Sequence, residues 1–205
     1  MHKMQHIATK ELDILKYFYS QRKGHVRQIK AAVTVSEHTL LKYLISLEKR
    51  KVLASRREGN LKIYEVNLQS DLVKIFFSYF DIERLAGLEY KRGKAVKAFT
   101  QLIKEIKYPY FMLLFGSSAK GVYGHKSDID MIIVYDVLDK GINDKIEEIK
   151  RKIAAETGLK ISSIIMRLDE FLKEKENKQN YALQDALTYG YPAFGNQLYY
   201  EVLFR

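Results

Sequence analysis

Two short patterns in the second half of the chain combine residue types that bind phosphate and divalent cations. Gly116-Ser117 follows one apolar run, and Asp128 and Asp130 come ten residues further on at the start of another. Carboxylates two positions apart on a strand point to the same face, roughly 6–7 Å apart along the backbone. Their oxygens can converge on a hard cation such as Mg²⁺ or Mn²⁺. Glycine, a helix start, a hydroxyl and the nearby Lys120 suit phosphate. Together they indicate a metal-complexed nucleoside triphosphate, and ATP is the nucleotide we expect.

Apolar runs and helical periodicity predict the elements that must position these residues. The expected elements are strands at 110–115, 129–135 and 160–167 and helices at about 70–86, 93–107 and 143–156. The helix at 93–107 carries one apolar stripe formed by Val96, Phe99, Ile103 and Ile106. The chain after residue 167 is expected to be helical, with breaks at 190–192 and near Gly195. This order predicts an α+β (α/β) fold.

The spacing resembles the signature of the nucleotidyltransferase superfamily that includes DNA polymerase beta, and most closely its minimal nucleotidyltransferases. The matching residues are Phe115-Gly116-Ser117, then ten residues, then Asp128-Ile129-Asp130-Met131. The resemblance extends over about 94–205 and implies a mixed sheet flanked by helices. It implies that Asp128 and Asp130 are catalytic residues that hold the metal, and that Gly116 and Ser117 surround the β- and γ-phosphates. Lys120 stands where this family usually has an arginine, which implies a contact with phosphate.

One departure from that family leaves two functions open. Its active members carry a third carboxylate on the next strand, whereas residues 159–167 contain no acid and place Ser162 or Ser163 there. The first alternative is an enzyme that transfers a nucleotidyl group to nucleic acid, to a protein hydroxyl or to a small molecule. The second is a DNA-binding transcriptional regulator whose second domain binds nucleotide without turnover.

The first third of the chain holds most of the positive charge. Residues 1–68 contain 14 lysines and arginines against 6 acidic residues, a net +8 of the total +10. The periodicity predicts helices at 9–22, 25–33 and 36–51, the last capped by Ser36, and a hairpin of two strands at 52–57 and 61–66. This order resembles a winged helix-turn-helix domain, which implies double-stranded DNA as a partner. The outer face of the third helix and the hairpin then supply the contacts: His38, Thr39, Lys42, Tyr43, Ser46, Lys49, Arg56, Arg57 and Lys62. Docking of a protein by this domain is the alternative.

The composition of the chain excludes several classes of site and indicates where the protein is located. The chain contains no cysteine, which excludes disulfides, thiolate metal sites and cysteine nucleophiles. It has neither an apolar leader nor a membrane-length apolar run, so we expect a cytoplasmic protein. The expected domains are a DNA-binding domain at 1–68, a helical connector at 69–93 and a nucleotidyltransferase domain at 94–205. The apolar stripes of the connector helices suggest a homodimer.

Overall fold

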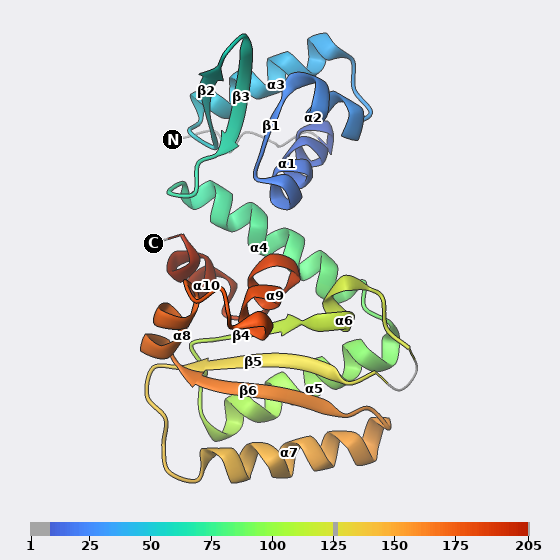
Figure 1. The fold of residues 1–205 in the computed structure, drawn as a ribbon. Coiled ribbons are helices and arrows are strands. Elements are labelled where there is room, and N and C mark those ends of the chain that lie inside the picture. Colours follow the sequence, from blue (N-terminus) through green and yellow to red (C-terminus); the bar gives the residue numbers. More distant parts are fainter. Residues whose placement is uncertain (1–8, 125–126, 205) are drawn as a thin grey trace, which may run out of the picture. The chain divides into compact units, whose positions relative to one another are not determined.

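The computed structural model describes residues 9–124 and 127–204. The chain divides into two compact units, residues 1–80 and 81–205, and the division falls within helix α4 (Asp71–Ala86). Figure 1 labels the elements along the chain. Among the described residues, no helix has the length and apolar character needed to cross a membrane.

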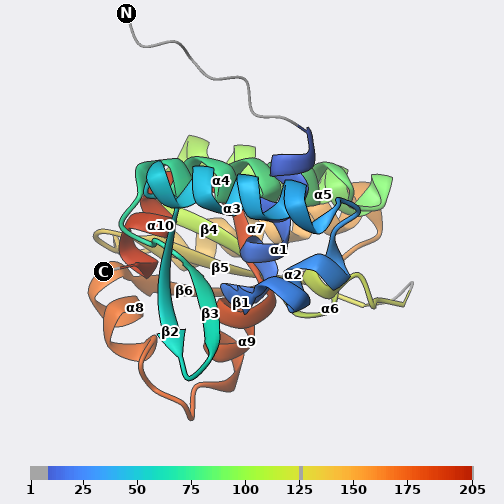
Figure 2. The same cartoon turned by 90° about the horizontal axis from the view of Figure 1, so that it is seen from above.

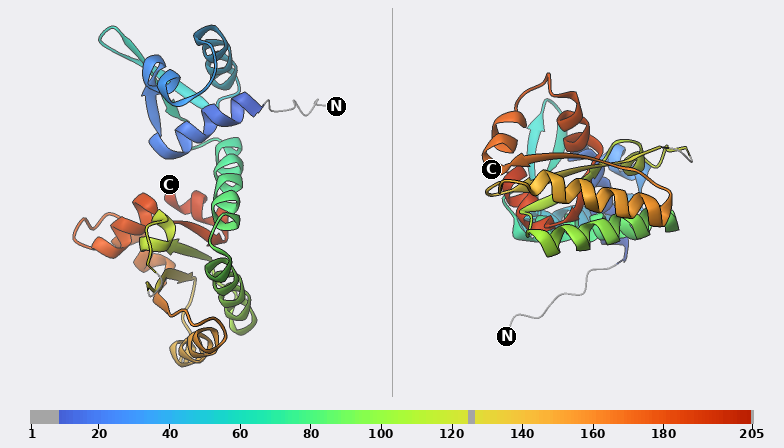
Figure 3. Two further views of the ribbon diagram at one scale, coloured as in Figure 1. Left: turned by 90° about the vertical axis from the view of Figure 1, so that its right-hand side faces the viewer. Right: turned by 90° about the horizontal axis from the view of Figure 1, so that it is seen from below.

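The first unit combines three helices with a small antiparallel sheet. Its elements in chain order are α1 (Thr9–Gln21), β1 (Lys23–His25), α2 (Val26–Ala32), α3 (Glu37–Lys49), β2 (Leu53–Glu58) and β3 (Leu61–Val66). The strands lie in the order β1-β3-β2, side by side in Figure 2. The left panel of Figure 3 shows the β2–β3 hairpin extending away from the helices of this unit.

Helix α3 begins and packs as its sequence predicts. The Ser36 hydroxyl accepts a hydrogen bond from the backbone N–H of Thr39 at 3.2 Å, which satisfies one free donor of the first turn. Leu40, Leu44 and Leu47 lie on one side of the helix and are fully buried. Because these leucines fix the inner face, the charged and polar side chains must lie on the outer one.

Strand β1 was not predicted, because three residues carry no measurable alternation. Lys23–His25 pairs with Ile63–Glu65 of β3, so the sheet gains a third strand between α1 and α2. His25 then caps α2 by accepting from the backbone N–H of Gln28.

The second unit is built on a mixed sheet, as predicted, but the sheet has four strands where the sequence indicated three. The strand order is β6-β5-β4-β7, with β5 and β6 parallel and the other pairs antiparallel. The elements are α5 (Tyr90–Ile106), β4 (Phe111–Phe115), α6 (Gly116–Lys120), β5 (Ile129–Tyr135), α7 (Ile142–Thr157), β6 (Ile161–Arg167), α8 (Leu168–Glu174), α9 (Tyr181–Tyr189), β7 (Tyr191–Phe194) and α10 (Asn196–Leu203).

Helices cover both faces of this sheet, as Figure 1 shows. On one face, Met131 and its alternate neighbours in β5 pack with the apolar stripes of α5 and α7. On the other face, Phe111 of β4 contacts the rings of Phe171 in α8 and Tyr199 in α10. Since side chains alternate along a strand, Asp130 lies on the face that α8 and α10 cover.

Strand β7 is the second element that was not predicted. The sequence around Gly190-Tyr191-Pro192 indicates only a break, whereas Tyr191–Phe194 pairs with β4 across a register shift between Met112 and Leu113. Proline is tolerated there because β7 is an edge strand.

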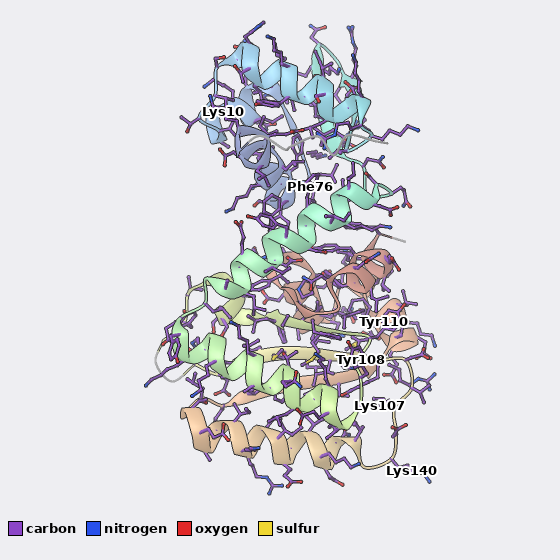
Figure 4. All side chains as sticks on the ribbon, turned by 180° about the vertical axis from the view of Figure 1, so that it is seen from behind. Lys10, Phe76, Lys107, Tyr108, Tyr110 and Lys140 are labelled. Carbon is purple, nitrogen blue, oxygen red and sulfur yellow. The ribbon has the colours of Figure 1, made fainter. Side chains whose placement is uncertain are left out.

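The connection from α5 to β4 is held by side chains that Figure 4 labels. Lys107 forms an ion pair with Asp139 at 2.7 Å, and the Tyr108 ring meets the Phe194 ring edge-on, with centroids 5.1 Å apart. These contacts fix the start of β4 relative to β5 and β7.

Candidate functional site

The two sequence patterns meet at one end of the sheet. Strands β4 and β5 are antiparallel neighbours, so the residue that ends β4 lies opposite the residues that begin β5. Phe115 pairs with Asp130, which places Gly116 directly beside this carboxylate.

Gly116 approaches Asp130 so closely that any Cβ at this position would meet the carboxylate. Its φ is +65°, a conformation that residues with a Cβ rarely adopt. A Cβ built on Gly116 would overlap the Asp130 Oδ2 atom and lie 3.1 Å from Asp130 Cγ. The backbone of the loop therefore lies in contact with the carboxylate.

The electrostatics of Asp130 show that acidic groups gather here. Burial raises the pKa of Asp130, and the negative charges of Asp128 and Asp185 raise it further, while Arg92 opposes them. Asp130 is half-buried and Asp128 is exposed. The fold thus holds carboxylates close together at a cost, which a bound cation would remove.

The short helix α6 carries the predicted phosphate-binding residues. Ser117 is half-buried near the start of α6, whereas Ser118 is buried. Lys120 forms an ion pair with Asp185 of α9, and its ammonium lies 4.7 Å from the centroid of the Tyr189 ring. Lys120 is exposed, but this ion pair ties its side chain to α9.

The loop between α6 and β5 is tied to helix α5 by Arg92. The Arg92 guanidinium donates to Ser118 Oγ at 2.9 Å, to the Gly124 carbonyl at 3.0 Å and to the Ser127 carbonyl at 2.8 Å. It also lies 4.1 Å from the centroid of the Tyr123 ring.

The two aspartates of the site can bind a hard divalent cation, but they provide few ligands. Asp128 and Asp130 offer carboxylate oxygens, which Mg²⁺ prefers. Within the described ranges, no group of three or more histidine, cysteine or carboxylate side chains is close enough to hold a metal ion. Ser162 of β6 lies opposite Asp130 in the parallel register, so a hydroxyl stands beside the acid on that strand.

In the first unit, helix α3 presents the predicted DNA-contacting residues to different degrees. His38, Lys42 and Lys49 are exposed, while Thr39, Tyr43 and Ser46 are half-buried. The Thr39 hydroxyl also lies 2.8 Å from the Ser36 hydroxyl. Ile45 is 48% exposed on the same outer stripe, and sequence reasoning did not single it out.

The predicted cations of the hairpin are mostly neutralised by neighbours. Arg56 pairs with Glu58 and Glu65, and Lys62 donates to Glu48 at 3.0 Å. Arg57 is exposed, and no ion pair joins it to another residue in the part of the chain that the structure describes. Of the three, Arg57 has the charge most available to a polyanion.

Two residues of the site were missed at the sequence level. Arg92 stands four positions before Val96, so a charged residue on the apolar stripe of α5 was the available signal. Asp185 comes from α9, far along the chain from the other acids, and no spacing rule connects it to them.

Comparisons with known proteins agree with this geometry for the second unit. Residues 94–186, slightly less than half of the chain, match the family model described as "Nucleotidyltransferase domain". The matched segment contains Gly116, Ser117, Asp128, Asp130 and Asp185. No curated protein matches the chain.

Two of the solved structures that resemble this chain do so with low TM-scores. A crystal structure of AF1382 from Archaeoglobus fulgidus is 19% identical with a TM-score of 0.35, over 40% of this chain and 93% of that chain. TrmBL2, described as an archaeal chromatin protein whose structure shows a novel mode of DNA binding, is 12% identical with a TM-score of 0.30. That comparison covers 86% of this chain and 72% of that chain.

Proposed function

We propose that the second unit transfers a nucleotidyl group from a Mg²⁺-bound nucleoside triphosphate, ATP being the expected donor, to an acceptor hydroxyl. The observation that carries this proposal is the contact between the Gly116 backbone and the Asp130 carboxylate, within the segment that matches the nucleotidyltransferase domain model. A phosphate-binding loop and an acidic pair in contact are the arrangement that such a substrate requires.

Each residue of the site has a specific task in this proposal. Asp128 and Asp130 hold the cation, which when bound supplies charge neutralisation for the phosphates. The Gly116-Ser117 backbone and hydroxyl orient the β- and γ-phosphates, and Lys120 adds a positive charge beside them. The acceptor oxygen forms a bond to the α-phosphorus and loses its hydroxyl proton to water, while the bond to pyrophosphate breaks and pyrophosphate leaves.

We further propose that the first unit is a winged helix that binds double-stranded DNA. The exposed cations of α3 and Arg57 of the hairpin support this, together with the net +8 of residues 1–68. Lysine and arginine contacts to phosphates give the affinity, and the half-buried polar residues of α3 are candidates for base contacts.

A second candidate function is a DNA-binding regulator that binds nucleotide without turnover. The specific observation in its favour is Ser162, which occupies the strand position opposite Asp130 where a third carboxylate is expected. Nucleotide occupancy of the second unit would then be the signal, with no bond made or broken.

Incubation with labelled ATP, GTP, CTP or UTP and Mg²⁺ tests these alternatives. The acceptors to supply are duplex DNA, small hydroxyl compounds and the protein itself, and pyrophosphate is measured. The Asp128→Asn, Asp130→Asn double variant should release none. Asp136→Asn, an exposed acid just beyond the far end of β5, is the control that should behave as the parent. Saturable binding without pyrophosphate would favour the regulator, and no binding at all would contradict both functions.

A further inference from the structure

Arg92 is a buried cation on an otherwise apolar helix face. It is 2% exposed, and it continues the stripe of Val96, Phe99 and Ile103, which packs against the sheet. A guanidinium at such a position is costly unless nearly all its donors are satisfied. Within the described residues no carboxylate forms an ion pair with it, so its hydrogen bonds go to neutral groups.

The groups that Arg92 contacts belong to both halves of the candidate site. On the phosphate side it donates to Ser118 Oγ at 2.9 Å, next in sequence to Ser117. On the acidic side it donates to the Ser127 carbonyl at 2.8 Å and reaches the Asp128 carbonyl at 3.5 Å.

The loop between these halves is held by the same side chain. The Gly124 carbonyl accepts from Arg92 at 3.0 Å, and the Tyr123 ring lies over the guanidinium. The planar guanidinium carries five donors in a fixed fork, so one side chain can hold several groups at set separations. A lysine has three donors on one atom and reproduces this only in part.

We infer that Arg92 is a positioning residue that holds the phosphate-binding half and the acidic half of the site in register. This inference rests on the proposed function, because the two halves need a fixed relative placement only if they bind a metal–triphosphate ligand together. Arg92 stands before the matched residues 94–186, so the family match does not account for it. If burial alone mattered here, an apolar side chain would continue the stripe at lower cost.

Arg92→Met and Arg92→Lys test the inference, with Ile103→Ala as the matched control. Ile103 lies on the same helix, is fully buried and touches neither half of the site through a hydrogen bond. Truncating it destabilises the unit by about 2–5 kcal/mol. Any effect that this control shares with Arg92→Met therefore reflects lost stability rather than lost positioning.

Two measurements are made on each full-length variant. Amide hydrogen exchange should accelerate in Arg92→Met within peptides covering 117–124 and 127–130, and not there in Ile103→Ala. Mn²⁺ affinity at a temperature where all variants are folded should fall at least about tenfold in Arg92→Met, as for other groups that orient metal ligands. Arg92→Lys should recover part of that loss, and Ile103→Ala should bind as the parent does.

Ser118→Ala is the fallback if Arg92→Met does not fold. It removes one acceptor of Arg92 and leaves the buried charge with its carbonyl partners, so a smaller change in the same direction is expected. Unchanged exchange in both peptides, or Mn²⁺ affinity that falls equally in Ile103→Ala, overturns the inference. If the parent binds neither Mn²⁺ nor nucleotide, the proposed function fails. The inferred role of Arg92 in ligand binding fails with it. Amide hydrogen exchange then tests only whether Arg92 holds the loop in place.

Discussion

Replacing Gly116 by alanine should disable the site through a single methyl group. Gly116 has φ +65°, where a side chain costs roughly 1–2 kcal/mol. The new Cβ would also overlap Asp130 Oδ2 and lie 3.1 Å from Asp130 Cγ. Because the carboxylate ends a rotatable side chain, it can turn aside without unfolding the unit. We therefore expect the methyl group to displace the Asp130 carboxylate, which is proposed to hold the cation.

Gly121→Ala separates this contact from the backbone strain. Gly121 has φ +71°, and no atom beyond its own residue and its two chain neighbours lies within 4 Å of where its Cβ would be. The two variants should therefore lose similar backbone stability, a drop on the order of 2–8 °C in melting temperature. Only Gly116→Ala adds the contact with Asp130.

The assays are thermal unfolding, Mn²⁺ titration and pyrophosphate release with Mg²⁺ and nucleotide. In Gly116→Ala we expect Mn²⁺ affinity and pyrophosphate release to fall at least about tenfold, while Gly121→Ala stays close to the parent in both. Equal Mn²⁺ affinity in the two variants would refute the reasoning that Gly116 is required to leave room for the carboxylate.

Three further predictions follow from individual contacts. Asp130→Asn should melt at a higher temperature than the parent in EDTA, because burial and the charges of Asp128 and Asp185 raise the pKa of Asp130. Since the ionised acid opposes folding, the difference in melting temperature between variant and parent should be largest above the folded-state pKa of Asp130 and vanish below its unfolded-state pKa. A difference that does not change with pH would contradict this. Arg57→Ala should weaken DNA binding and lower the salt slope by about one, measured by fluorescence anisotropy, whereas Arg56→Ala, whose charge is paired, should change little. Asp185→Asn should tighten nucleotide binding about two- to fivefold by releasing Lys120, and weaker binding in calorimetry would count against this.

Much of the second unit could be predicted from its sequence. The strand at 129–135 was predicted with its observed bounds, because every residue in it except Asp130 is apolar and polar residues flank it at Asp128 and Asp136. The run at 110–115 matches β4 to within one residue. Once these strands pair as antiparallel neighbours, the loop after one and the acids of the other must share an edge.

The two missed strands depend on pairing rather than on periodicity. Lys23–His25 and Tyr191–Phe194 are three and four residues long, and each forms at an edge of a sheet whose other strands are already in place. Pro192 indicates a break in any local reading, and only the edge position makes it compatible with a strand.

The parts of the site that could not be predicted are those that need long-range contacts. The negative charge of Asp185, on helix α9, raises the pKa of Asp130, and Lys120 forms its ion pair with Asp185. In the hairpin, pairing of Arg56 with Glu65 depends on the register of β2 and β3, so sequence alone counted both hairpin arginines as available.

Electron paramagnetic resonance of bound Mn²⁺, recorded with and without nucleoside triphosphate, tests the proposed site most directly. We predict a phosphorus hyperfine coupling to the bound ion when nucleotide is present, and loss of both ion and coupling in the Asp128→Asn, Asp130→Asn variant. Ion binding without phosphorus coupling, or coupling that survives in that variant, would contradict the site.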